Sequence, residues 1–536
     1  MNKKIIYSFL VVVACFSLFL NLYKKDQSPV CFNADEAAFG YNAYSILKTG
    51  KDEYGAPFPL RLKSFGDYKM PLYSYLSIPF ISAMGLTESS TRILNDLLAF
   101  LFPFAVFFLV KELFKNDSVA ILSSILVATS LGLHTIARQA HEAYLAAFLI
   151  TLSATFLLRV LKKPDLINSL LFSFFSLLSL FSYQSSRIFI GFFLLVLLIS
   201  FFRGKKEKNT KQLTLPVILT ILVLALFSIT DIVYKTERVK NLLFFNNLGF
   251  SLRINELRSE GGSYLLYNKL TTGVKELTGE YLKYFSPQFL LVSGDENPRF
   301  GLIDMSLITP LEYFLFFAGL FFLFKNKEQW RFFVIGLLLV SPLAASLTWA
   351  GLSLTRSLFL LIPITLLASY GFFELYKNIK NYRLFLLLVF VVAEIFFLTY
   401  SWDLYLNHYT KRATTITAWQ CGYKKLADYV QVNNTRFDQF VITRKNGQPY
   451  IFLIFYLIYP PEQYQQQARL SNPDEYGFGQ VEKFDKFSFS FRFDPKQQNT
   501  AFIGYPDDFD RSRLDQNKLK KIAQGGQDIF WIYENP

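Results

Sequence analysis

The chain is a succession of long apolar runs, and this feature restricts its possible folds more than any other. Runs of about 17–25 residues are long enough to cross a bilayer as α-helices, and hydropathy indicates about eleven of them. They lie near 5–23, 90–110, 118–134, 143–161, 166–183, 187–203, 213–232, 308–324, 330–348, 356–376 and 384–402. The sequence therefore predicts an α-helical polytopic membrane protein.

Composition supports this class. Of the 536 residues, 52% are hydrophobic and only 18% are charged, whereas a soluble protein carries about a quarter charged residues. The formal net charge of +14 could suggest a nucleic-acid partner. Most Lys and Arg between residues 100 and 390, however, lie in short gaps between apolar runs, where they set topology. We expect a membrane lipid environment and no nucleic acid.

The basic gaps alternate along the chain. If Lys3 and Lys4 are cytoplasmic, the cytoplasmic gaps are 111–115, 159–163, 203–211, 325–331 and 377–383, and each of them carries Lys or Arg. This pattern obeys the positive-inside rule and predicts an N-in, C-out topology. The first run could instead be a cleaved signal peptide. No small-residue cleavage site follows it, so we expect an uncleaved span.

Three segments would then lie outside the membrane. Segment 24–89 contains an apolar stretch at 72–86 that prolines interrupt, which favours an interfacial helix over a span. Segment 233–307 is predicted to be a large loop with one or two surface helices. Residues 403–536 lack spanning runs and are predicted to form a small external α/β domain, after a transmembrane domain at 1–402.

Within the C-terminal domain we expect a helix at about 419–432. The strand-like runs are 440–443, 450–456, 487–493, 501–503 and 529–533. The three cysteines, Cys15, Cys31 and Cys421, have no metal-ligand spacing. Cys31 and Cys421 would both lie outside, so a bridge between them stays open.

Two adjacent carboxylates, Asp35 and Glu36, follow the first apolar run. Such a pair is costly to desolvate at a membrane boundary, which favours chemistry on a substrate that approaches from outside. Further polar residues lie at the predicted outer ends: Lys69, Arg138, His141, Glu142, Tyr183, Gln184, Arg187, Asp295, Asn297, Arg299 and Arg356. The cations among them oppose the topology rule, and a shared site for an anionic group at headgroup level would explain them.

A sugar linked to a long isoprenoid through phosphate would supply that anion. Its transfer needs a carboxylate that accepts the proton of the attacking hydroxyl, and Asp35 is suited to this role. It also needs cations that stabilise the departing phosphate. The candidates are Lys69, Arg138, Arg187 and Arg356.

Several motifs together resemble the GT-C superfamily of integral-membrane glycosyltransferases. They are Asp35-Glu36 with Gly40-Tyr41, Lys69-Met70-Pro71-Leu72-Tyr73, 138–142, 183–187, 285–290 with Gly294-Asp295, and Arg356 with Pro363. The resemblance is to the bacterial branch related to protein O-mannosyltransferases and to the aminoarabinose transferase of lipid A. It covers about residues 1–400 and, more loosely, the C-terminal domain.

The resemblance implies inverting transfer from a polyprenyl-phosphate sugar to a glycan, lipid or protein acceptor, at the outer face of a bacterial cytoplasmic membrane. It implies that Asp35 is the catalytic base and that Lys69 contacts the donor phosphate. Relatives often have Lys-Pro-Pro where this chain has Lys69-Met70-Pro71, which removes one fixed φ angle. We place Glu36 beside Asp35 in the catalytic group. We expect further substrate contacts from Tyr41, Tyr73, His141, Glu142, Tyr183 and Asp295.

Some relatives use a divalent metal. Asp35, Glu36, His141 and Glu142 could supply ligands, but their spacing does not demand a metal, and we expect no cofactor. Structural roles stay open for the cations. Lys69 could be an interfacial lysine with a buried stem, and each arginine could cap a helix C-terminus or pair with a loop carboxylate.

Two other functions stay open. A transporter or flippase of lipid-linked sugars would place ionisable residues along a path inside the spans, where the sequence offers few candidates, notably Glu394 and Asp96. A non-enzymatic scaffold would leave the outer cations unexplained.

Overall fold

The computed structural model describes residues 3–65, 67–203, 210–234, 243–301, 304–349, 351–472 and 479–536. The predicted basic gap at 203–211 lies largely outside this set. The chain forms two compact units. The first unit consists of Met1–Tyr23 and Asn95–Tyr405, and the second of Lys24–Leu94 and Leu406–Pro536. By its contacts, the segment that follows the first helix therefore groups with the C-terminal residues.

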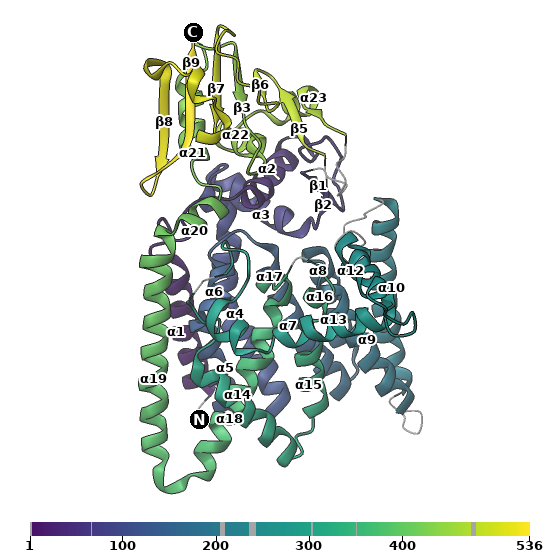
Figure 1. Ribbon diagram of the computed structural model, residues 1–536. Helices are drawn as coiled ribbons and strands as arrows, with labels where there is room; N and C mark the ends of the chain where they lie inside the picture. The colour runs from purple at the N-terminus through teal and green to yellow at the C-terminus, as the bar shows by residue number, and fades with distance from the viewer. Residues whose placement is uncertain are drawn as a thin grey trace. The chain divides into compact units, whose positions relative to one another are not determined.

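The first unit is helical, and each predicted apolar run coincides with one or more helices (Figure 1). Its longer helices are α1 (Lys3–Leu22), α4 (Glu88–Phe114, whose first turns belong to the second unit), α5 (Asp117–Thr129), α6 (Leu131–Ala137), α7 (Glu142–Lys162), α8 (Leu166–Ser182), α9 (Ser186–Arg203), α10 (Thr210–Val233), α14 (Pro310–Lys325), α15 (Arg331–Val340), α18 (Leu361–Asn378) and α19 (Arg383–Asp403). Two short helices, α16 (Leu343–Ser346) and α17 (Leu354–Ser357), flank the loop before α18. The predicted helical membrane architecture is confirmed.

Fewer helices than the predicted eleven spans are long and apolar enough, by length and composition, to cross a membrane on their own. Among the described residues, seven helices are long and apolar enough to cross a membrane, or up to eight if the pair α5 and α6, bent by 54°, is one span. Helix α8 has 17 residues and α14 has 16. The run at 330–348 is divided between α15 and α16. Hydropathy marks apolar runs, but it does not reveal where a helix breaks.

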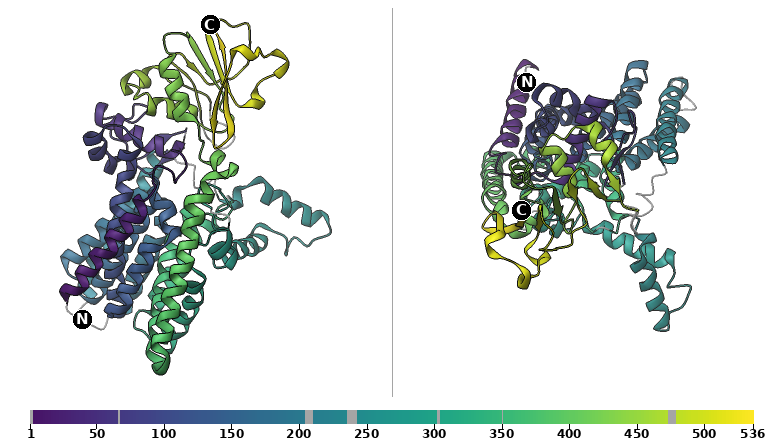
Figure 2. Two further views of the ribbon diagram at one scale, coloured as in Figure 1. Left: turned by 90° about the vertical axis from the view of Figure 1, so that its left-hand side faces the viewer. Right: turned by 90° about the horizontal axis from the view of Figure 1, so that it is seen from above.

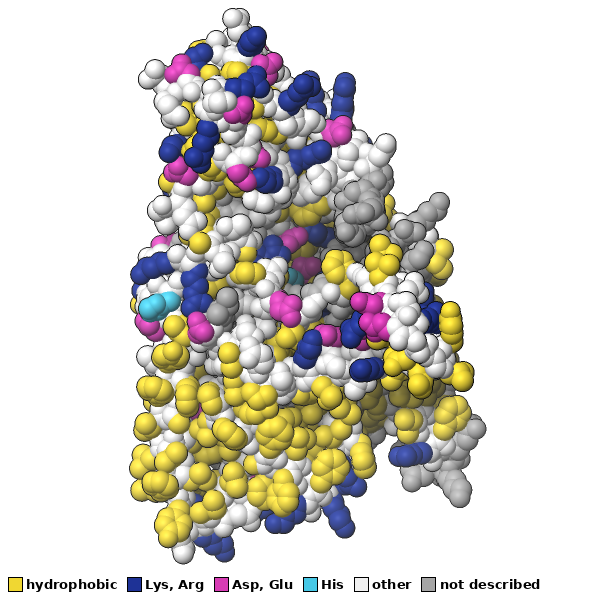
Figure 3. All heavy atoms as spheres, in the orientation of Figure 1, with side chains coloured by type: hydrophobic (Ala, Val, Ile, Leu, Met, Phe, Trp, Pro, Cys, Tyr) yellow, Lys and Arg dark blue, Asp and Glu magenta, His cyan; other side chains and the backbone are white. Residues whose placement is uncertain are grey.

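Close backbone packing joins α14 to α18. A Cβ atom on Gly319 of α14 would lie 1.9 Å from the carbonyl oxygen of Leu367, and one on Gly371 of α18 would lie 2.3 Å from that of Leu315. Only glycine fits at both positions, as is common where membrane helices approach closely. The outer surface of the helices is apolar, and Lys and Arg side chains gather at one end (Figure 3).

The predicted loop at 233–307, for which one or two surface helices were expected, contains α12 (Leu248–Ser259) and α13 (Lys269–Lys283). They project sideways from the helices of the first unit (Figure 2). Residues 235–242 and 302–303 of this loop lie outside the described set.

The second unit contains a seven-stranded mixed sheet in the order β4-β5-β6-β3-β7-β9-β8. The strands are β3 (Gln439–Ile442), β4 (Arg469–Leu470), β5 (Val481–Phe484), β6 (Phe487–Ser488), β7 (Thr500–Gly504), β8 (Leu519–Gln524) and β9 (Gln527–Asn535). Strand β3 is parallel to β6 and β7, and the remaining pairs are antiparallel. The predicted C-terminal sheet domain is confirmed.

Alternate residues of the sheet enter two different cores, as the twofold strand period requires. Phe440 and Ile442 of β3 face helices α21 (Tyr423–Val432), α22 (Pro449–Tyr456) and α2 (Ala34–Thr49). Val441 faces the opposite side with Phe502 and Trp531. The first loop and the C-terminal sheet therefore share one hydrophobic core.

A disulfide bond links the first loop to the C-terminal residues. Cys31, just before α2, is bonded to Cys421, just before α21, with a Cα–Cα distance of 5.5 Å. This bond joins the two chain segments of the second unit. The other elements of the first loop are a hairpin of β1 (Leu62–Ser64) and β2 (Asp67–Lys69), followed by α3 (Leu72–Met84). Helix α3 forms where an interfacial helix was predicted.

Two predicted strands are wrong. Residues 450–456 form helix α22, in which Pro449 occupies the first turn, a position that tolerates proline. Residues 450–455 are all buried, and periodicity cannot distinguish a fully buried helix from a buried strand. In the run 487–493, only Phe487–Ser488 forms a strand. The helix at 419–432 is confirmed as α21, with a later start at Tyr423.

Candidate functional site

Helix α2 presents the acidic pair. Asn33 caps the helix, and its side-chain oxygen accepts hydrogen bonds from the amides of Asp35 (3.0 Å) and Glu36 (3.2 Å). Glu36 returns the contact by accepting from the Asn33 amide at 3.2 Å, which completes a capping box. Both carboxylates therefore lie in the first turn, where the helix dipole favours negative charge.

Glu36 points into the protein. Its two carboxylate oxygens accept from Nε (2.7 Å) and Nη2 (2.8 Å) of Arg92 in α4. Only 1% of the Glu36 side chain and 7% of the Arg92 side chain are exposed. Arg92 also donates to the carbonyl of Cys31 at 2.9 Å. These contacts fasten the start of α2 to α4, and a catalytic role for Glu36 stays a prediction.

Asp35 points the other way. The Lys69 ammonium, at the end of β2, lies 2.6 Å from its carboxylate. The Lys69 side chain is 9% exposed, whereas that of Asp35 is 33% exposed. The same ammonium lies 4.3 Å from the ring centroid of Phe65 and 5.3 Å from that of Phe39, distances at which a cation is attracted to a ring face. A buried cation thus supports a carboxylate that solvent can reach.

A second acidic pair, Asp52 and Glu53, lies in the same loop, and the sequence analysis did not identify it. Burial and the charge of Asp52 raise the pKa of Glu53 well above its ordinary value, and the Lys69 charge opposes this shift. The Glu53 carboxylate accepts from the Tyr450 hydroxyl at 3.4 Å, and its amide donates to the Asn42 side chain at 3.0 Å. Lys69 is therefore placed among carboxylates from two parts of the loop. Asp52 and Glu53 are adjacent in the sequence, as Asp35 and Glu36 are, and this shared Asp-Glu motif could have identified the second pair.

Tyr41 and Tyr73, predicted to contact substrate, lie in the interior of the second unit. The Tyr41 hydroxyl donates to the carbonyl of Tyr459 at 2.9 Å, and that of Tyr73 to the carbonyl of Thr91 at 3.1 Å. Both side chains are fully buried. These contacts fix the position of α2 and α3, and substrate binding by the two tyrosines stays a prediction.

In the first unit, Arg138 has the contacts of a helix cap. It is fully buried and donates to the carbonyls of Leu20 (2.6 Å), Asn21 (3.0 Å) and Tyr23 (2.8 Å) at the C-terminal end of α1. Cations are favourable at this end of a helix. Arg138 therefore caps the C-terminal end of a helix, which was the structural alternative to phosphate binding.

Arg187, at the start of α9, forms an ion pair with Asp231 of α10 at 2.9 Å. It also donates to the side chain of Gln184 at 2.8 Å, and its guanidinium lies 4.6 Å from the ring centroid of Phe227. Arg187 thus joins α9 to α10 through a helical carboxylate, whereas the structural alternative considered for it was a loop carboxylate.

Asp295 holds two loops of the first unit together. Its carboxylate accepts from the amides of Leu354 (2.6 Å) and Asn297 (2.8 Å). Burial raises the pKa of Asp295 to about 6, although the charges of Arg356 and Arg299 act in the opposite direction. The loop before α17 is also fixed by Tyr284, whose hydroxyl accepts from the amide of Ser353 at 3.0 Å.

Several predicted residues converge near this loop. The Tyr183 hydroxyl donates to Thr355 at 3.4 Å. The imidazole ring of His141 packs against the rings of Tyr183 and Phe300, with centroid distances of 6.1 and 5.4 Å. His141 also caps α7 by accepting from the Ala143 amide at 3.1 Å. We call the set His141, Glu142, Tyr183, Asp295, Thr355 and Arg356 the loop cluster.

Arg356 connects the loop cluster to a cavity of about 400 Å³. Its guanidinium donates to the side chain of Thr348 at 3.0 Å. Thr348 lines the cavity with Trp349, Glu296 and residues of α12 and α13. The lining carries both charges, since Arg253, Lys283, Glu276 and Glu280 also contribute. Among the described residues, no group of three or more His, Cys, Asp or Glu side chains is arranged to hold a metal ion.

The helical first unit, the capped acidic pair on the first loop and the C-terminal sheet define the class of protein. The chain has the fold of the GT-C superfamily of membrane glycosyltransferases, as the sequence predicted. The profile of the family described as dolichyl-phosphate-mannose-protein mannosyltransferase matches residues 35–235, which begin at Asp35. No curated protein sequence matches the chain.

Two solved structures specify the relationship. ArnT from Cupriavidus metallidurans, bound to undecaprenyl phosphate, is similar over 99% of this chain and 98% of its own, with 10% identity and a TM-score of 0.55. The oligosaccharyltransferase AglB from Archaeoglobus fulgidus, in complex with an inhibitory peptide and a dolichol-phosphate, is similar over 85% of this chain with 13% identity and a TM-score of 0.50. This chain spans 64% of that AglB chain. The predicted GT-C fold is thereby confirmed.

Proposed function

We propose that the chain transfers a sugar from a polyprenyl-phosphate-linked donor to an acceptor hydroxyl. The observation that carries the proposal is the Asp35–Lys69 pair, a partly exposed carboxylate on a buried ammonium. This combination provides both groups that the reaction needs: a proton acceptor and a cation for the leaving phosphate.

The pair suggests how the two roles are coupled. A phosphate that binds Lys69 competes with Asp35 for the ammonium, so Asp35 is released as the phosphate arrives. Asp35 then accepts the proton of the acceptor hydroxyl while the hydroxyl oxygen forms a bond to the anomeric carbon. The bond from that carbon to the phosphate oxygen breaks, and the polyprenyl phosphate leaves with its electron pair. Attack opposite the leaving group inverts the anomeric configuration.

The comparisons support the donor class. ArnT was solved with undecaprenyl phosphate and AglB with a dolichol-phosphate, and both ligands are polyprenyl phosphates. We extend this donor class to the present chain. We also propose that the reaction takes place at the outer face of a bacterial cytoplasmic membrane, because the alternating basic gaps assign the first loop to that side.

Among the other predicted cations, Arg356 is the second candidate for the phosphate. It is half-buried, and its charge acts on the Asp295 carboxylate of the loop cluster. Arg138 and Arg187 are engaged in contacts that support structural roles, and the proposal does not depend on them. His141, Glu142, Tyr183 and Asp295 remain proposed substrate contacts.

The test is a turnover assay on purified protein. Radiolabelled polyprenyl-phosphate sugars are incubated with envelope extracts as the acceptor source, and loss of lipid-linked label is measured. We expect the Asp35→Asn variant to lose label about 10²–10⁴-fold more slowly than wild type, the usual contribution of a general base. Asp428→Asn, at an exposed position on α21, is the matched control and should be fully active.

The same assay separates the alternative functions. A flippase would move intact lipid-linked sugar across proteoliposomes without loss of label, and a scaffold would leave the lipid unchanged. Asp35→Asn protein that transfers sugar at the wild-type rate would exclude Asp35 as the base.

A further inference from the structure

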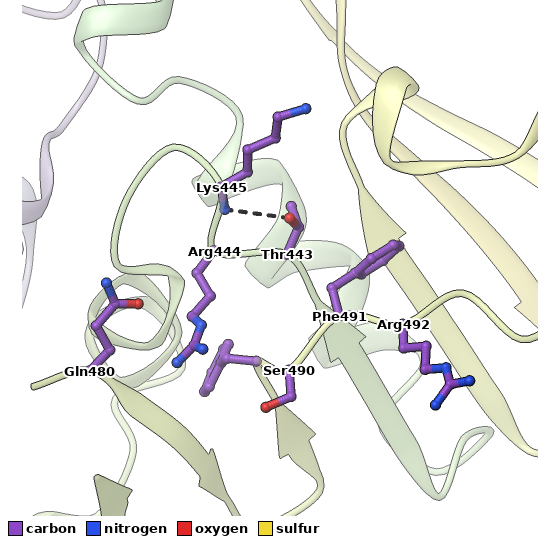
Figure 4. Close-up of a pocket in the computed structure, with 8 residues that line it drawn as sticks. Thr443, Arg444, Lys445, Gln480, Ser490, Phe491 and Arg492 are labelled. Atoms are coloured by element: carbon purple, nitrogen blue, oxygen red, sulfur yellow. Dashed lines mark hydrogen bonds between the residues drawn. The ribbon is translucent and has the colours of Figure 1, made fainter. Parts of the chain in front are cut away.

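The sheet of the second unit carries a cavity that the proposed transfer reaction does not use. Its volume is about 580 Å³, within the range of about 300–1,000 Å³ typical of small-molecule sites. Its lining residues come from two short segments and one further position: Thr443, Arg444 and Lys445; Phe489, Ser490, Phe491 and Arg492; and Gln480. Figure 4 shows this cavity.

The topology of the sheet explains the position of the cavity. Strands β3 and β6 are parallel neighbours, so both strands end at the same edge of the sheet. Residues 443–445 directly follow β3, and residues 489–492 directly follow β6. Gln480 directly precedes β5, which is antiparallel to β6 and so begins at that edge. Open sheets commonly bind ligands in the crevice beyond the carboxyl ends of parallel strands.

Arg444 is the central charge of this edge. Its side chain extends into the space between Gln480 and Ser490, whereas Lys445 extends in the opposite direction (Figure 4). One terminal nitrogen of Arg444, Nη1, is shielded from solvent and has no hydrogen-bond partner among the described residues. Leaving a charged donor unpaired in a shielded position is unfavourable. A ligand oxygen bound in the cavity would supply the missing partner.

The two other cations of the lining, Lys445 and Arg492, differ in whether a carboxylate of the protein already binds them. Lys445 is engaged by two carboxylates, Asp507 and Asp508, and the latter lies at 3.7 Å. Arg492 is exposed, and no ion pair or hydrogen bond joins its side chain to another described residue. In Figure 4, however, the Arg492 side chain extends away from Arg444. The cavity therefore offers one guanidinium group, that of Arg444, to an anion, and guanidinium groups bind carboxylates and phosphates through paired hydrogen bonds.

The rest of the lining fits a polyhydroxylated ligand. The hydroxyls of Thr443 and Ser490 and the amide of Gln480 can each donate and accept hydrogen bonds. The ring of Phe491 is half-buried and packs against the rings of Phe502 and Phe509. Together the Arg444 guanidinium, the two hydroxyls and the amide fit an anion that also bears hydroxyl groups better than they fit an apolar ligand.

We propose that this cavity is a second binding site of the protein, which binds an acidic saccharide through Arg444. The shared chemistry is a sugar ring that bears an oxyanion, supplied by a carboxylate or by a phosphate. The inference rests on the sheet domain alone and stands whether or not Asp35 and Lys69 act in transfer.

The test is ligand binding to the full-length protein in detergent, followed by saturation-transfer NMR. The probes are glucuronic acid, glucose 6-phosphate and glucose at equal concentration. We expect binding of at least one acidic sugar and no comparable binding of glucose. Binding of glucuronic acid alone identifies a carboxylate ligand, binding of glucose 6-phosphate alone a phosphate ligand, and binding of both the shared oxyanion. Absence of binding by both acidic sugars, or equal binding of glucose, would overturn the proposal.

Three variants locate the site. Arg444→Gln should weaken binding of the acidic sugar by about tenfold or more, since a charge-assisted hydrogen bond is lost. Ser490→Trp, at an exposed position, should block the cavity without disturbing the fold. Arg513→Gln, at an exposed arginine that does not line the cavity, should bind as wild type.

A further comparison separates this site from the proposed donor site. Asp35→Asn protein should bind the acidic sugar with unchanged affinity, because Asp35 does not line the cavity. Loss of binding in that variant, or wild-type binding in both Arg444→Gln and Ser490→Trp, would place the sugar elsewhere and contradict the inference.

Discussion

Two adjacent carboxylates on α2 form two different ion pairs. Glu36 and Arg92 are 1% and 7% exposed and share two hydrogen bonds, so they form a buried bidentate pair. Asp35 and Lys69 share one contact of 2.6 Å, and Asp35 remains 33% exposed. One helix turn thus directs one carboxylate inward and the next toward solvent. Neighbouring residues of equal charge can therefore have different roles. The buried carboxylate is suited to a structural role, and the partly exposed carboxylate is suited to a chemical one.

The largest expected effect tests this division directly. Glu36→Gln removes one partner of a buried pair and leaves Arg92 without its counter-charge, which costs about 3–5 kcal/mol in such sites. Asp35→Asn disturbs a pair that solvent reaches and leaves the Lys69 ammonium within electrostatic range of Glu53, so it should destabilise the protein less than Glu36→Gln does. Thermal unfolding of both variants in detergent measures the difference. Equal destabilisation would remove the proposed distinction between the two pairs.

The second prediction concerns Lys69. Replacing it with methionine keeps the aliphatic stem against Phe65 and Phe39 but removes the charge. If Lys69 stabilises the leaving phosphate, transfer should slow by about 10²–10³-fold. Lys424→Met is the control, because Lys424 also pairs with a carboxylate, that of Glu88, but is 67% exposed. A Lys69→Met enzyme as active as this control would leave Lys69 with a structural role only.

The third prediction concerns the disulfide before α2. Replacing Cys31 and Cys421 together with serine removes the covalent link between the two segments of the second unit. We expect a loss of about 2–4 kcal/mol in stability. Transfer at a permissive temperature should persist, because the Asn33 cap and the Glu36–Arg92 pair still hold the start of α2. Unfolding curves under reducing and oxidising conditions measure the effect, and wild-type and variant curves that coincide when oxidised would contradict it.

The smallest effect extends the comparison to Asp295, a buried carboxylate that two backbone amides hold. Its pKa is raised from 3.8 to about 6, so its protonated form is favoured in the folded state. Its contribution to stability is fully present below about pH 4 and is lost as the pH rises through about 6. The loss corresponds to about 2–3 kcal/mol.

The measurement is the unfolding temperature in detergent from pH 4 to 7. Asp295→Asn should reduce the decline over this range, since the asparagine side chain does not titrate. Asp428→Asn, at an exposed position, is the control and should decline as wild type does. An Asp295→Asn curve parallel to wild type would show that other groups cause the pH dependence.

Much of the fold could be predicted, because its signals are local. Each long apolar run forms helix, since a segment in lipid must satisfy its own backbone hydrogen bonds. The break between α15 and α16 and the helical state of 450–456 could not be predicted. Both depend on packing around residues whose composition fits more than one conformation.

The candidate site could be predicted in part. Asp35 and Lys69 were expected in one site, and the structure places them 2.6 Å apart. Arg138 was an equally plausible phosphate ligand in the sequence, yet its guanidinium binds carbonyls at the end of α1. Glu53 was overlooked, because nothing in its local sequence shows that it is buried beside Tyr450, almost 400 residues later.

The sequence by itself determined the membrane class, the GT-C resemblance and the adjacent acidic pair, because hydropathy and motif spacing act over a few residues. Only the tertiary structure decided that the first loop shares a core with the C-terminal sheet, that Cys31 and Cys421 bond, and that an unpaired guanidinium lies at the ends of β3 and β6. Each of those features brings together residues that are far apart in the chain. Tertiary packing, rather than the local sequence pattern, determines which residues come into contact.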